Sequence, residues 1–219
     1  MAQVLVKGER VSFDNELVSE LSYSVKSCHL CKKLVESRTQ PVTGYGDFTA
    51  RVLFIGEAPG RLGADMTGIP FTKDRSGMLL QKMLYMIGMN ESGPESIPPK
   101  LKDVYITNIV KCNPRKEDGS NRSPTNDEIS SCMNYLEKEI EIVKPQLIVT
   151  LGLPASKVVL GKEFDGRDFG KIIVKEKFHV MPLWHPAFVI RGGGAQRMNE
   201  KKYSKFFYKI RDIVTTEAR

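Results

Sequence analysis

The sequence LFIGEAPG at residues 53–60 decides how this chain folds. The apolar run that stops at Gly56 predicts a buried strand, and the Gly and Pro residues after it predict an irregular loop because they cannot continue a ladder. Open α/β sheets bind ligands at the carboxyl ends of their strands. We therefore expect a ligand site in the following loop, which presents the carboxylates of Glu57 and Asp65 and the ring of Phe71. Ser76 is expected to cap the next helix.

Three further apolar runs have the length and composition of strands. They lie at residues 104–110, 147–152 and 178–183. Helical apolar spacing alternates with them, at residues 14–36, 78–89, 126–140 and 200–214. The apolar residues of 78–89 lie all round the helix, which predicts a mostly buried helix. This alternation predicts an α/β protein: a three-layer α/β/α sandwich with a central, mostly parallel four-stranded sheet, formed by one domain over residues 1–219. Residues 171–177 are expected to form one arm of an edge hairpin.

Composition narrows the class of protein and of partner. The chain has 219 residues, 41% of them hydrophobic and 27% charged, which is ordinary for a globular protein. No apolar run approaches bilayer length, and the start has no signal-peptide core, so we expect a cytoplasmic protein without a membrane partner. The formal net charge of +7 favours a polyanionic partner such as nucleic acid, although charge alone is weak support.

The four cysteines are Cys28, Cys31, Cys112 and Cys132. In a reducing compartment an even count is better explained by a metal or cluster than by disulfides. Cys28 and Cys31 form a chelating pair, but the other two are too far apart in sequence for a second knuckle. The pattern therefore fits an iron–sulfur cluster better than a zinc ribbon, while sulfur ligands alone cannot choose between zinc and iron. Cys112 and Cys132 could also be small buried hydrophobic residues.

Several motifs at the expected strand ends occur together. They are GEAPG at 56–60 with TGIPF at 67–71, TNIVKC at 107–112, HPA at 185–187 with Arg191, and the four cysteines in this order. This combination resembles the iron–sulfur uracil-DNA glycosylases, family 4 of that superfamily, from Cys28 to the C-terminal helix. The loop between residues 60 and 67 is one residue longer than in family 4, and residues 63–77 look more like the broader-specificity family 5. The substrate range therefore stays open.

The resemblance implies roles in catalysis for three residues. Cleaving an N-glycosidic bond leaves positive charge on the sugar and negative charge on the base, so the site needs a carboxylate and a hydrogen-bond donor on opposite sides. Glu57 would orient the attacking water and stabilise the sugar cation, with Asp65 as the second candidate. His185 would donate a hydrogen bond to uracil as a neutral imidazole. No amine nucleophile stands out in these loops, so no lyase step is expected.

The resemblance also implies how the base is bound. Gly56 and Ala58 would line the base pocket, and Phe71 would stack on the flipped uracil. The amide of Asn108 offers one acceptor and one donor, which match the adjacent donor and acceptor of uracil and not the reverse pattern of cytosine.

For the DNA and the cofactor, the resemblance implies a loop and a cluster. The loop over residues 185–193 would fill the gap left in the duplex, with Arg191 as the wedge and Gly192 allowing close approach to phosphate. The four cysteines would hold a structural [4Fe-4S] cluster that ties the N-terminal helix to the body. The expected partner is uracil-containing DNA, single- or double-stranded, bound by a monomer.

Three other functions stay open on the sequence. The same chemistry could act on hypoxanthine or xanthine, as the family 5 features allow. The chain could instead be a non-catalytic, zinc-stapled nucleic-acid-binding module, or a redox protein that uses a cluster for electron transfer.

Overall fold

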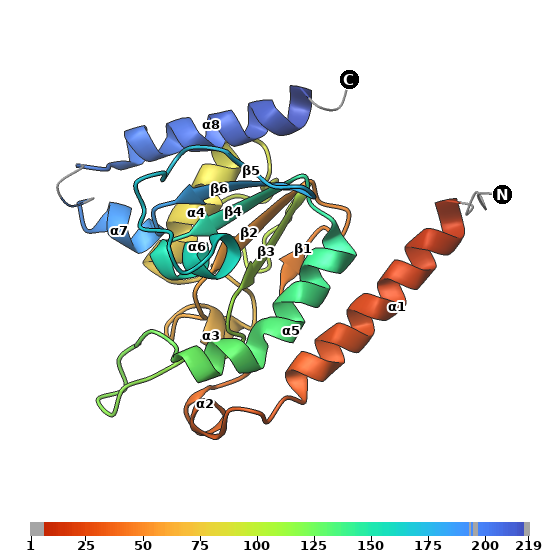
Figure 1. Ribbon diagram of the computed structural model, residues 1–219, viewed down its shortest axis with the longest axis vertical. Coiled ribbons are helices and arrows are strands. Elements are labelled where there is room, and N and C mark those ends of the chain that lie inside the picture. Colours follow the sequence, from red (N-terminus) through yellow and green to blue (C-terminus); the bar gives the residue numbers. More distant parts are fainter. Residues whose placement is uncertain (1–6, 193, 195–196, 217–219) are drawn as a thin grey trace.

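The architecture is one open sheet between layers of helices. A computed structural model describes residues 7–192, 194 and 197–216 (Figure 1). The sheet has six strands in the order β1-β3-β2-β4-β6-β5. The strands are β1 (Tyr45–Gly46), β2 (Val52–Gly56), β3 (Val104–Asn108), β4 (Leu147–Leu151), β5 (Ile173–Val174) and β6 (His179–Leu183). The helices are α1 (Lys7–Lys26), α2 (Lys32–Ser37), α3 (Ala64–Thr67), α4 (Arg75–Met86), α5 (Asn126–Val143), α6 (Leu153–Leu160), α7 (Pro186–Ile190) and α8 (Glu200–Thr216).

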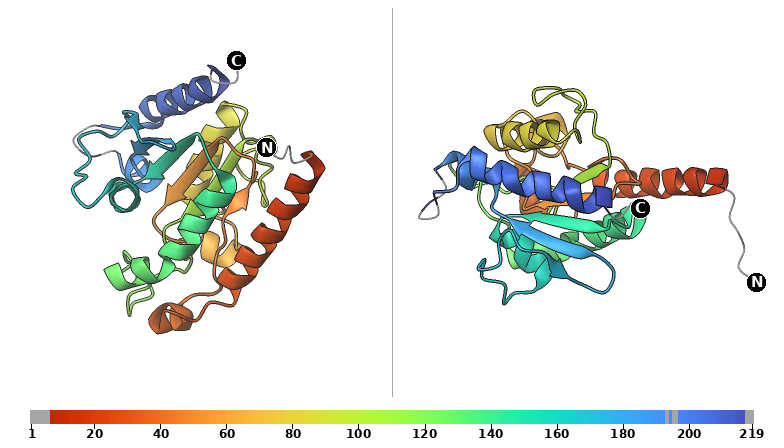
Figure 2. Two further views of the ribbon diagram at one scale, coloured as in Figure 1. Left: turned by 45° about the vertical axis from the view of Figure 1, so that its right-hand side comes forward. Right: turned by 90° about the horizontal axis from the view of Figure 1, so that it is seen from above.

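The two faces of the sheet are both covered, as Figure 2 shows from above. Successive residues of β2 point to opposite faces. Phe54 joins the core under α4 and α8, where its ring stacks on Phe207 at 6.0 Å, whereas Leu53 and Ile55 join the core under α5. Helix α1 packs along α5 on the outside of that second layer (Figure 1). Burial on both faces explains why the strands are continuous apolar runs.

The predicted fold class is confirmed, and the sheet is larger than predicted. Strands β3, β2, β4 and β6 form the expected parallel core, and β5 pairs antiparallel with β6 as the expected edge hairpin. The prediction of four strands was wrong because β1 also adds an antiparallel edge to β3. An edge strand of two residues is too short to leave a periodic pattern in the sequence.

One prediction for the helix after Phe71 is confirmed and one is wrong. Helix α4 is mostly buried as predicted, although Met78, Tyr85 and Met86 are exposed at 40%, 53% and 43%. Its cap is Asp74 and not Ser76, because the Asp74 carboxylate accepts a hydrogen bond from the Gly77 backbone N–H at 2.7 Å. Among the described helices, none combines the length and the hydropathy needed to cross a bilayer.

The parallel strands bring distant residues to one edge of the sheet. Strand β2 ends at Gly56, β3 at Asn108 and β6 at Leu183, two residues before His185. The chain passes from β2 to β3 on one side and returns across β2 to β4 on the other, which makes this edge the topological switch point. This is the edge of the sheet at which the sequence predicts the ligand site.

Candidate active site

A cavity of about 180 Å³ opens at the carboxyl ends of the strands. We call it the strand-end cavity. Its lining comes from five separate segments of the chain. The lining residues are Glu57, Ala58, Pro59, Gly60, Ala64, Phe71, Asp74, Ser76, Asn108, Asn113, Pro114, Asn121, Arg122, His185 and Ala187. The structure therefore brings together five of the predicted site residues: Glu57, Ala58, Phe71, Asn108 and His185.

Two buried oxygen atoms at the strand-end cavity have no hydrogen-bond partner among the described residues: Oε1 of Glu57 and Oδ1 of Asn108. Only one other buried side-chain atom of the described chain, Nδ1 of His179, is in this state. A buried acceptor without a partner costs about 1–3 kcal/mol, and such groups are rare in folded proteins. Two of them on one cavity indicate a site that receives hydrogen-bond donors from a ligand.

Because Gly56 has no side chain, the side chains of Asn108 and Phe71 can pack directly against its backbone. A Cβ at residue 56 would lie 2.4 Å from Oδ1 of Asn108 and 2.6 Å from the ring of Phe71. Phe71 itself has a φ of 51°, in the left-handed region that side chains other than glycine rarely adopt. Gln81 donates a hydrogen bond to its carbonyl at 3.2 Å, and the backbone of Phe71 and Thr72 packs against Gly77 with no room for a Cβ. Local strain of this kind is found at functional sites.

The imidazole of His185 is positioned by the start of α7. Its Nδ1 accepts a hydrogen bond from the Ala187 backbone N–H at 3.1 Å, so the neutral ring carries its proton on Nε2. Burial, and then the positive charge of Arg191, lower the pKa of His185 to about 4. The ring lies 5.8 Å from that of Phe71. His185 therefore faces the strand-end cavity as a neutral hydrogen-bond donor at physiological pH.

A buried ion pair supports the backbone of Asn108. The ammonium group of Lys111 donates to the carbonyl of Asn108 at 2.7 Å, to Oγ1 of Thr107 at 2.7 Å and to Oε2 of Glu139 at 2.6 Å. Both side chains of the pair are only 2% exposed. Every donor of the ammonium group is thereby used, which is the condition under which a buried charge is tolerated. The network holds the end of β3, and with it Asn108, in one place.

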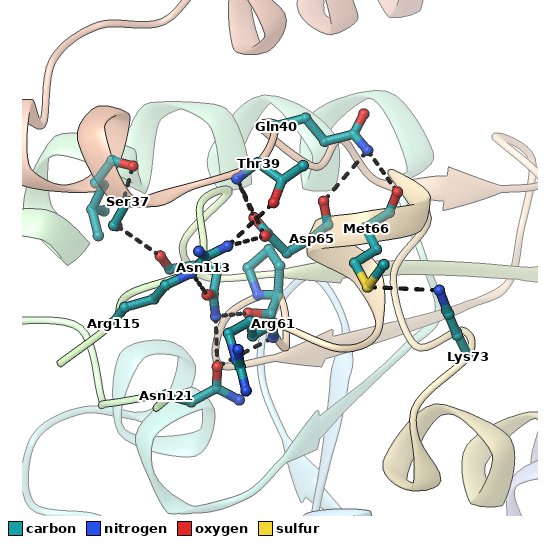
Figure 3. Close-up of polar contacts among 12 residues, drawn as sticks. Ser37, Thr39, Gln40, Arg61, Asp65, Met66, Lys73, Asn113, Arg115 and Asn121 are labelled. Atoms are coloured by element: carbon teal, nitrogen blue, oxygen red, sulfur yellow. Dashed lines mark hydrogen bonds and ion pairs between the residues drawn. The ribbon is translucent and has the colours of Figure 1, made fainter. Parts of the chain in front are cut away.

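Asp65 does not line the strand-end cavity. Its carboxylate is fully buried and accepts hydrogen bonds from the Thr39 backbone N–H at 3.0 Å and from the Arg115 guanidinium at 2.5 Å (Figure 3). Arg115 also donates to Oδ1 of Asn113 at 2.8 Å, and Asn113 donates to the carbonyl of Pro59 at 2.6 Å. Asp65 thus belongs to a network that holds the loop after Glu57 from behind.

The cavity also contains residues that the sequence analysis missed. Asp74 reaches it as the cap of α4, and burial raises the pKa of its carboxyl group. Asn113, Asn121 and Arg122 come from the polar tract after β3, which turns back on itself through a bridge between residues 115 and 121. The helix-cap pattern could have identified Asp74. The bridge joins residues only six apart, and Asp118-Gly119 between them is a local turn signal that could have predicted it. That this turn lies at the cavity depends on contacts with other segments, which no local pattern shows.

Three predicted site residues are not among the lining residues of the strand-end cavity: Gly56, Arg191 and Gly192. Arg191 and Gly192 follow α7 and are exposed. The charge of Arg191 is near enough to His185 to affect its pKa. Gly192 has a φ of +90° with open space around it. Residue 193 of the predicted loop lies outside the described residues.

The four cysteines lie in one region, although they come from three segments of the chain. Burial, opposed by the Lys111 backbone N–H and charge and aided by the charges of Cys112 and Cys31, raises the pKa of the Cys132 thiol to about 11. The Arg38 guanidinium donates to Sγ of Cys112 at 3.1 Å, and the Lys111 backbone N–H donates to Sγ of Cys132 at 3.5 Å. Within the described chain, no three His, Cys, Asp or Glu side chains are close enough to hold a single metal ion.

Known proteins are similar in sequence to this chain over most of its length. The family model of the Uracil DNA glycosylase superfamily matches residues 43–211. The Type-4 uracil-DNA glycosylase of Sulfurisphaera tokodaii is 33% identical over 213 residues, which cover 92% of this chain and 87% of that protein. The Type-4 enzyme of Thermotoga maritima is 37% identical over 182 residues, 80% of this chain and 84% of its own. The Type-5 uracil-DNA glycosylase of Pyrobaculum aerophilum is 32% identical, over 74% of this chain and 78% of its own. The chain therefore belongs to the uracil-DNA glycosylase superfamily.

Proposed function

We propose that this protein is a uracil-DNA glycosylase, which takes uracil out of DNA and hydrolyses its N-glycosidic bond as the first step of base excision repair. One observation carries the proposal: the strand-end cavity holds two buried, unpartnered acceptor oxygens, on Glu57 and Asn108, together with a neutral donor, His185. A flipped uracil and an attacking water supply the missing donors and the missing acceptor.

Asn108 and Phe71 recognise the base. Oδ1 of Asn108 accepts the N3–H of uracil, and the amide nitrogen donates to the neighbouring carbonyl oxygen. The buried ion pair below Asn108 holds its backbone carbonyl, and so the position from which the amide extends. Cytosine presents an acceptor where uracil presents N3–H. Binding of cytosine would therefore leave one buried polar group of the protein and one of the base without partners, which makes the mismatch costly. The ring of Phe71 stacks on the base from the side that Gly56 leaves open.

Glu57 and His185 act on opposite sides of the bond that breaks. The oxygen of a water molecule oriented by the Glu57 carboxylate bonds to C1′ of the sugar, and the proton of the water passes to that carboxylate. The bond between C1′ and N1 breaks with its electron pair leaving on uracil. The Nε2–H of His185 donates to the uracil oxygen that gathers this charge, and the negative charge of Glu57 stabilises the sugar cation. A neutral donor does this without a buried positive charge.

Asp65 acts as a positioning residue for the catalytic loop. Its pairing with Arg115 and Thr39 uses its oxygens away from the cavity (Figure 3). Through Arg115 and Asn113 it restrains the carbonyl of Pro59, two residues from Glu57. Glu57 is therefore the carboxylate that acts on the sugar and the water.

Cys28, Cys31, Cys112 and Cys132 fit a [4Fe-4S] cluster better than a single zinc ion. A cluster takes its four thiolates at four corners, so its ligands lie further apart than those of one tetrahedral ion, and no single-ion site is formed by the described residues. The N–H donors on Sγ of Cys112 and Cys132 suit thiolates that carry negative charge. The four cysteines would hold such a cluster, which would link the N-terminal segment, the end of β3 and α5 covalently. An iron and acid-labile sulfide assay on the purified protein tests this assignment.

The DNA approaches along the edge that carries the strand-end cavity. One copy of the chain suffices to bind uracil-containing DNA, because all the residues assigned to catalysis and recognition come from one chain. Exposed Arg191 and Gly192 border the cavity beside His185, where they meet the gap left by the flipped nucleotide.

Uracil release and DNA binding, measured together, test the proposal. The substrate is a duplex with a single U·G pair, and matched duplexes carry hypoxanthine or xanthine in place of uracil. We expect uracil to be released fastest. Glu57→Gln should lower the single-turnover rate by about 10²- to 10⁴-fold, which is typical of the loss of a general base, and leave the affinity for DNA unchanged or higher. Exposed Glu141 provides the matched control, Glu141→Gln, which should keep the full rate. A wild-type protein that releases no uracil, or an active Glu57→Gln protein, would refute the proposal.

A further inference from the structure

The rim of the strand-end cavity formed by residues 60–78 exposes apolar and cationic side chains. Leu62 and Met66 are exposed at 60% and 49%. Arg61, Lys73 and Arg75 are exposed on the same segment. Figure 3 shows Lys73 reaching across to Met66, where its Nζ lies 3.6 Å from the sulfur atom. Exposed apolar side chains that lie among cations suit a polyanion that also offers apolar faces.

The acidic residues of this rim are turned inward. Asp65 is fully buried in its pair with Arg115, and Asp74 caps α4. The rim therefore presents no exposed carboxylate over residues 60–78 of the described chain, while its three cations face solvent. This separation of charge is what a surface that meets phosphate requires.

Leu62 is held rigidly beside the strand-end cavity, within two residues of the lining residues Gly60 and Ala64. The Gly63 and Asp65 backbone N–H groups both donate to the carbonyl of Gly60, each at 3.1 Å. A Cβ at residue 60 or 63 would lie 2.6 Å or 2.4 Å from Oδ2 of Asp74, so the turn packs tightly on its inner side. A leucine presented on so constrained a turn would keep its position when it enters a tight site.

We propose that Leu62 enters the DNA duplex beside the flipped nucleotide, as an apolar wedge from the 60–78 rim of the strand-end cavity. The inference rests on the proposed function. Proteins that kink or open DNA insert leucine or methionine between base steps and so offset part of the cost of unstacking. Arg61 and Lys73 contact the flanking phosphates, and Leu62 takes the place of a stacking partner. Leu62 and Arg191, which come from separate loops, together hold the duplex open while the base enters the strand-end cavity.

The test compares duplex with single-stranded substrate, because only the duplex has a continuous stack to open. Leu62→Ala should lower the single-turnover rate on a U·A duplex roughly 10- to 100-fold, as expected for the loss of one leucine contact. The same variant should keep the full rate on a single-stranded oligonucleotide of the same sequence. The fluorescence of 2-aminopurine rises when the base unstacks. A 2-aminopurine next to uracil should therefore show a smaller rise in fluorescence when Leu62→Ala binds the duplex than when the wild-type protein does. Leu62→Met should restore both signals.

Two controls keep this result separate from the proposed function. Met86→Ala removes an exposed side chain twelve residues after the cap Asp74, about 18 Å along α4, and should behave as wild type. The 2-aminopurine signal is also read in the Glu57→Gln background, where unstacking is seen without base release. A full duplex rate for Leu62→Ala, or an equal loss on single and double strands, would overturn the wedge. The absence of uracil release by the wild-type protein would overturn the proposed function instead, and the unstacking signal would still decide the wedge.

Discussion

Replacement of Gly56 by alanine would test the geometry of the site with a single methyl group. The added Cβ would lie 2.4 Å from Oδ1 of Asn108 and 2.6 Å from the ring of Phe71. Ordinary van der Waals contact begins at 3.4 Å, so these groups must retreat by about 1 Å. The backbones of both residues are held, that of Asn108 by the Lys111 ammonium and that of Phe71 by Gln81, so the retreat must come from rotation of the amide and the ring away from the positions that bind the base.

The expected effect on activity is large and the effect on stability is modest. Overpacking of this kind costs about 1–3 kcal/mol of unfolding free energy. A displacement of about 1 Å in a positioning group can lower a rate by about 10²-fold. We therefore expect Gly56→Ala to remain folded, with an unfolding free energy reduced by about 2 kcal/mol and uracil release slowed about 100-fold.

A second glycine separates the two effects. Gly88 has a φ of +76° and open space around the position of a Cβ, so Gly88→Ala strains the backbone by about 1–2 kcal/mol without touching the strand-end cavity. Chemical denaturation gives the unfolding free energy of both variants, and single-turnover uracil release gives their rates. Gly88→Ala should keep the wild-type rate. A folded Gly56→Ala protein with the wild-type rate would refute the assignment of Asn108 and Phe71 to base binding.

Three further predictions concern the Asp65 ion pair, the His185 imidazole and the cysteines. Asp65→Asn should lower the unfolding free energy by about 2–4 kcal/mol, because it leaves Arg115 without its buried partner, and should lower kcat far less than Glu57→Gln does; full stability with a loss of kcat as large as that of Glu57→Gln would make Asp65 catalytic. The pKa of His185 is about 4 in the folded protein and 6.5 in the unfolded chain, so the unfolded state binds more protons between these values and stability falls as pH is lowered from 6.5 to 4, by at most about 1.4 kcal/mol per pH unit. His185→Gln should flatten this part of the stability profile in acid titration, and an unchanged profile would contradict the lowered pKa. Cys132→Ser should reduce bound iron and the protection of α1 from proteolysis, and unchanged iron content would remove Cys132 from the cluster ligands.

Local sequence determined the elements and the order of the motifs. Strands that are buried on both faces must be continuous apolar runs, and helices with one buried face must repeat at about 3.6 residues, so both leave patterns within a few residues of one another. The four long strands could be predicted for that reason, and the structure confirms them. The parallel sheet then required Glu57, Asn108 and His185 to meet at one edge.

Tertiary structure alone decided which carboxylate faces the cavity and which supports the loop. Asp65 and Glu57 are both acidic residues of one loop, and nothing within that loop separates their roles. The difference arises because Arg115, fifty residues away, pairs with Asp65, while no described residue pairs with Oε1 of Glu57. Burial and pairing depend on contacts between segments that are distant in the chain, and such contacts leave no periodic trace in the sequence.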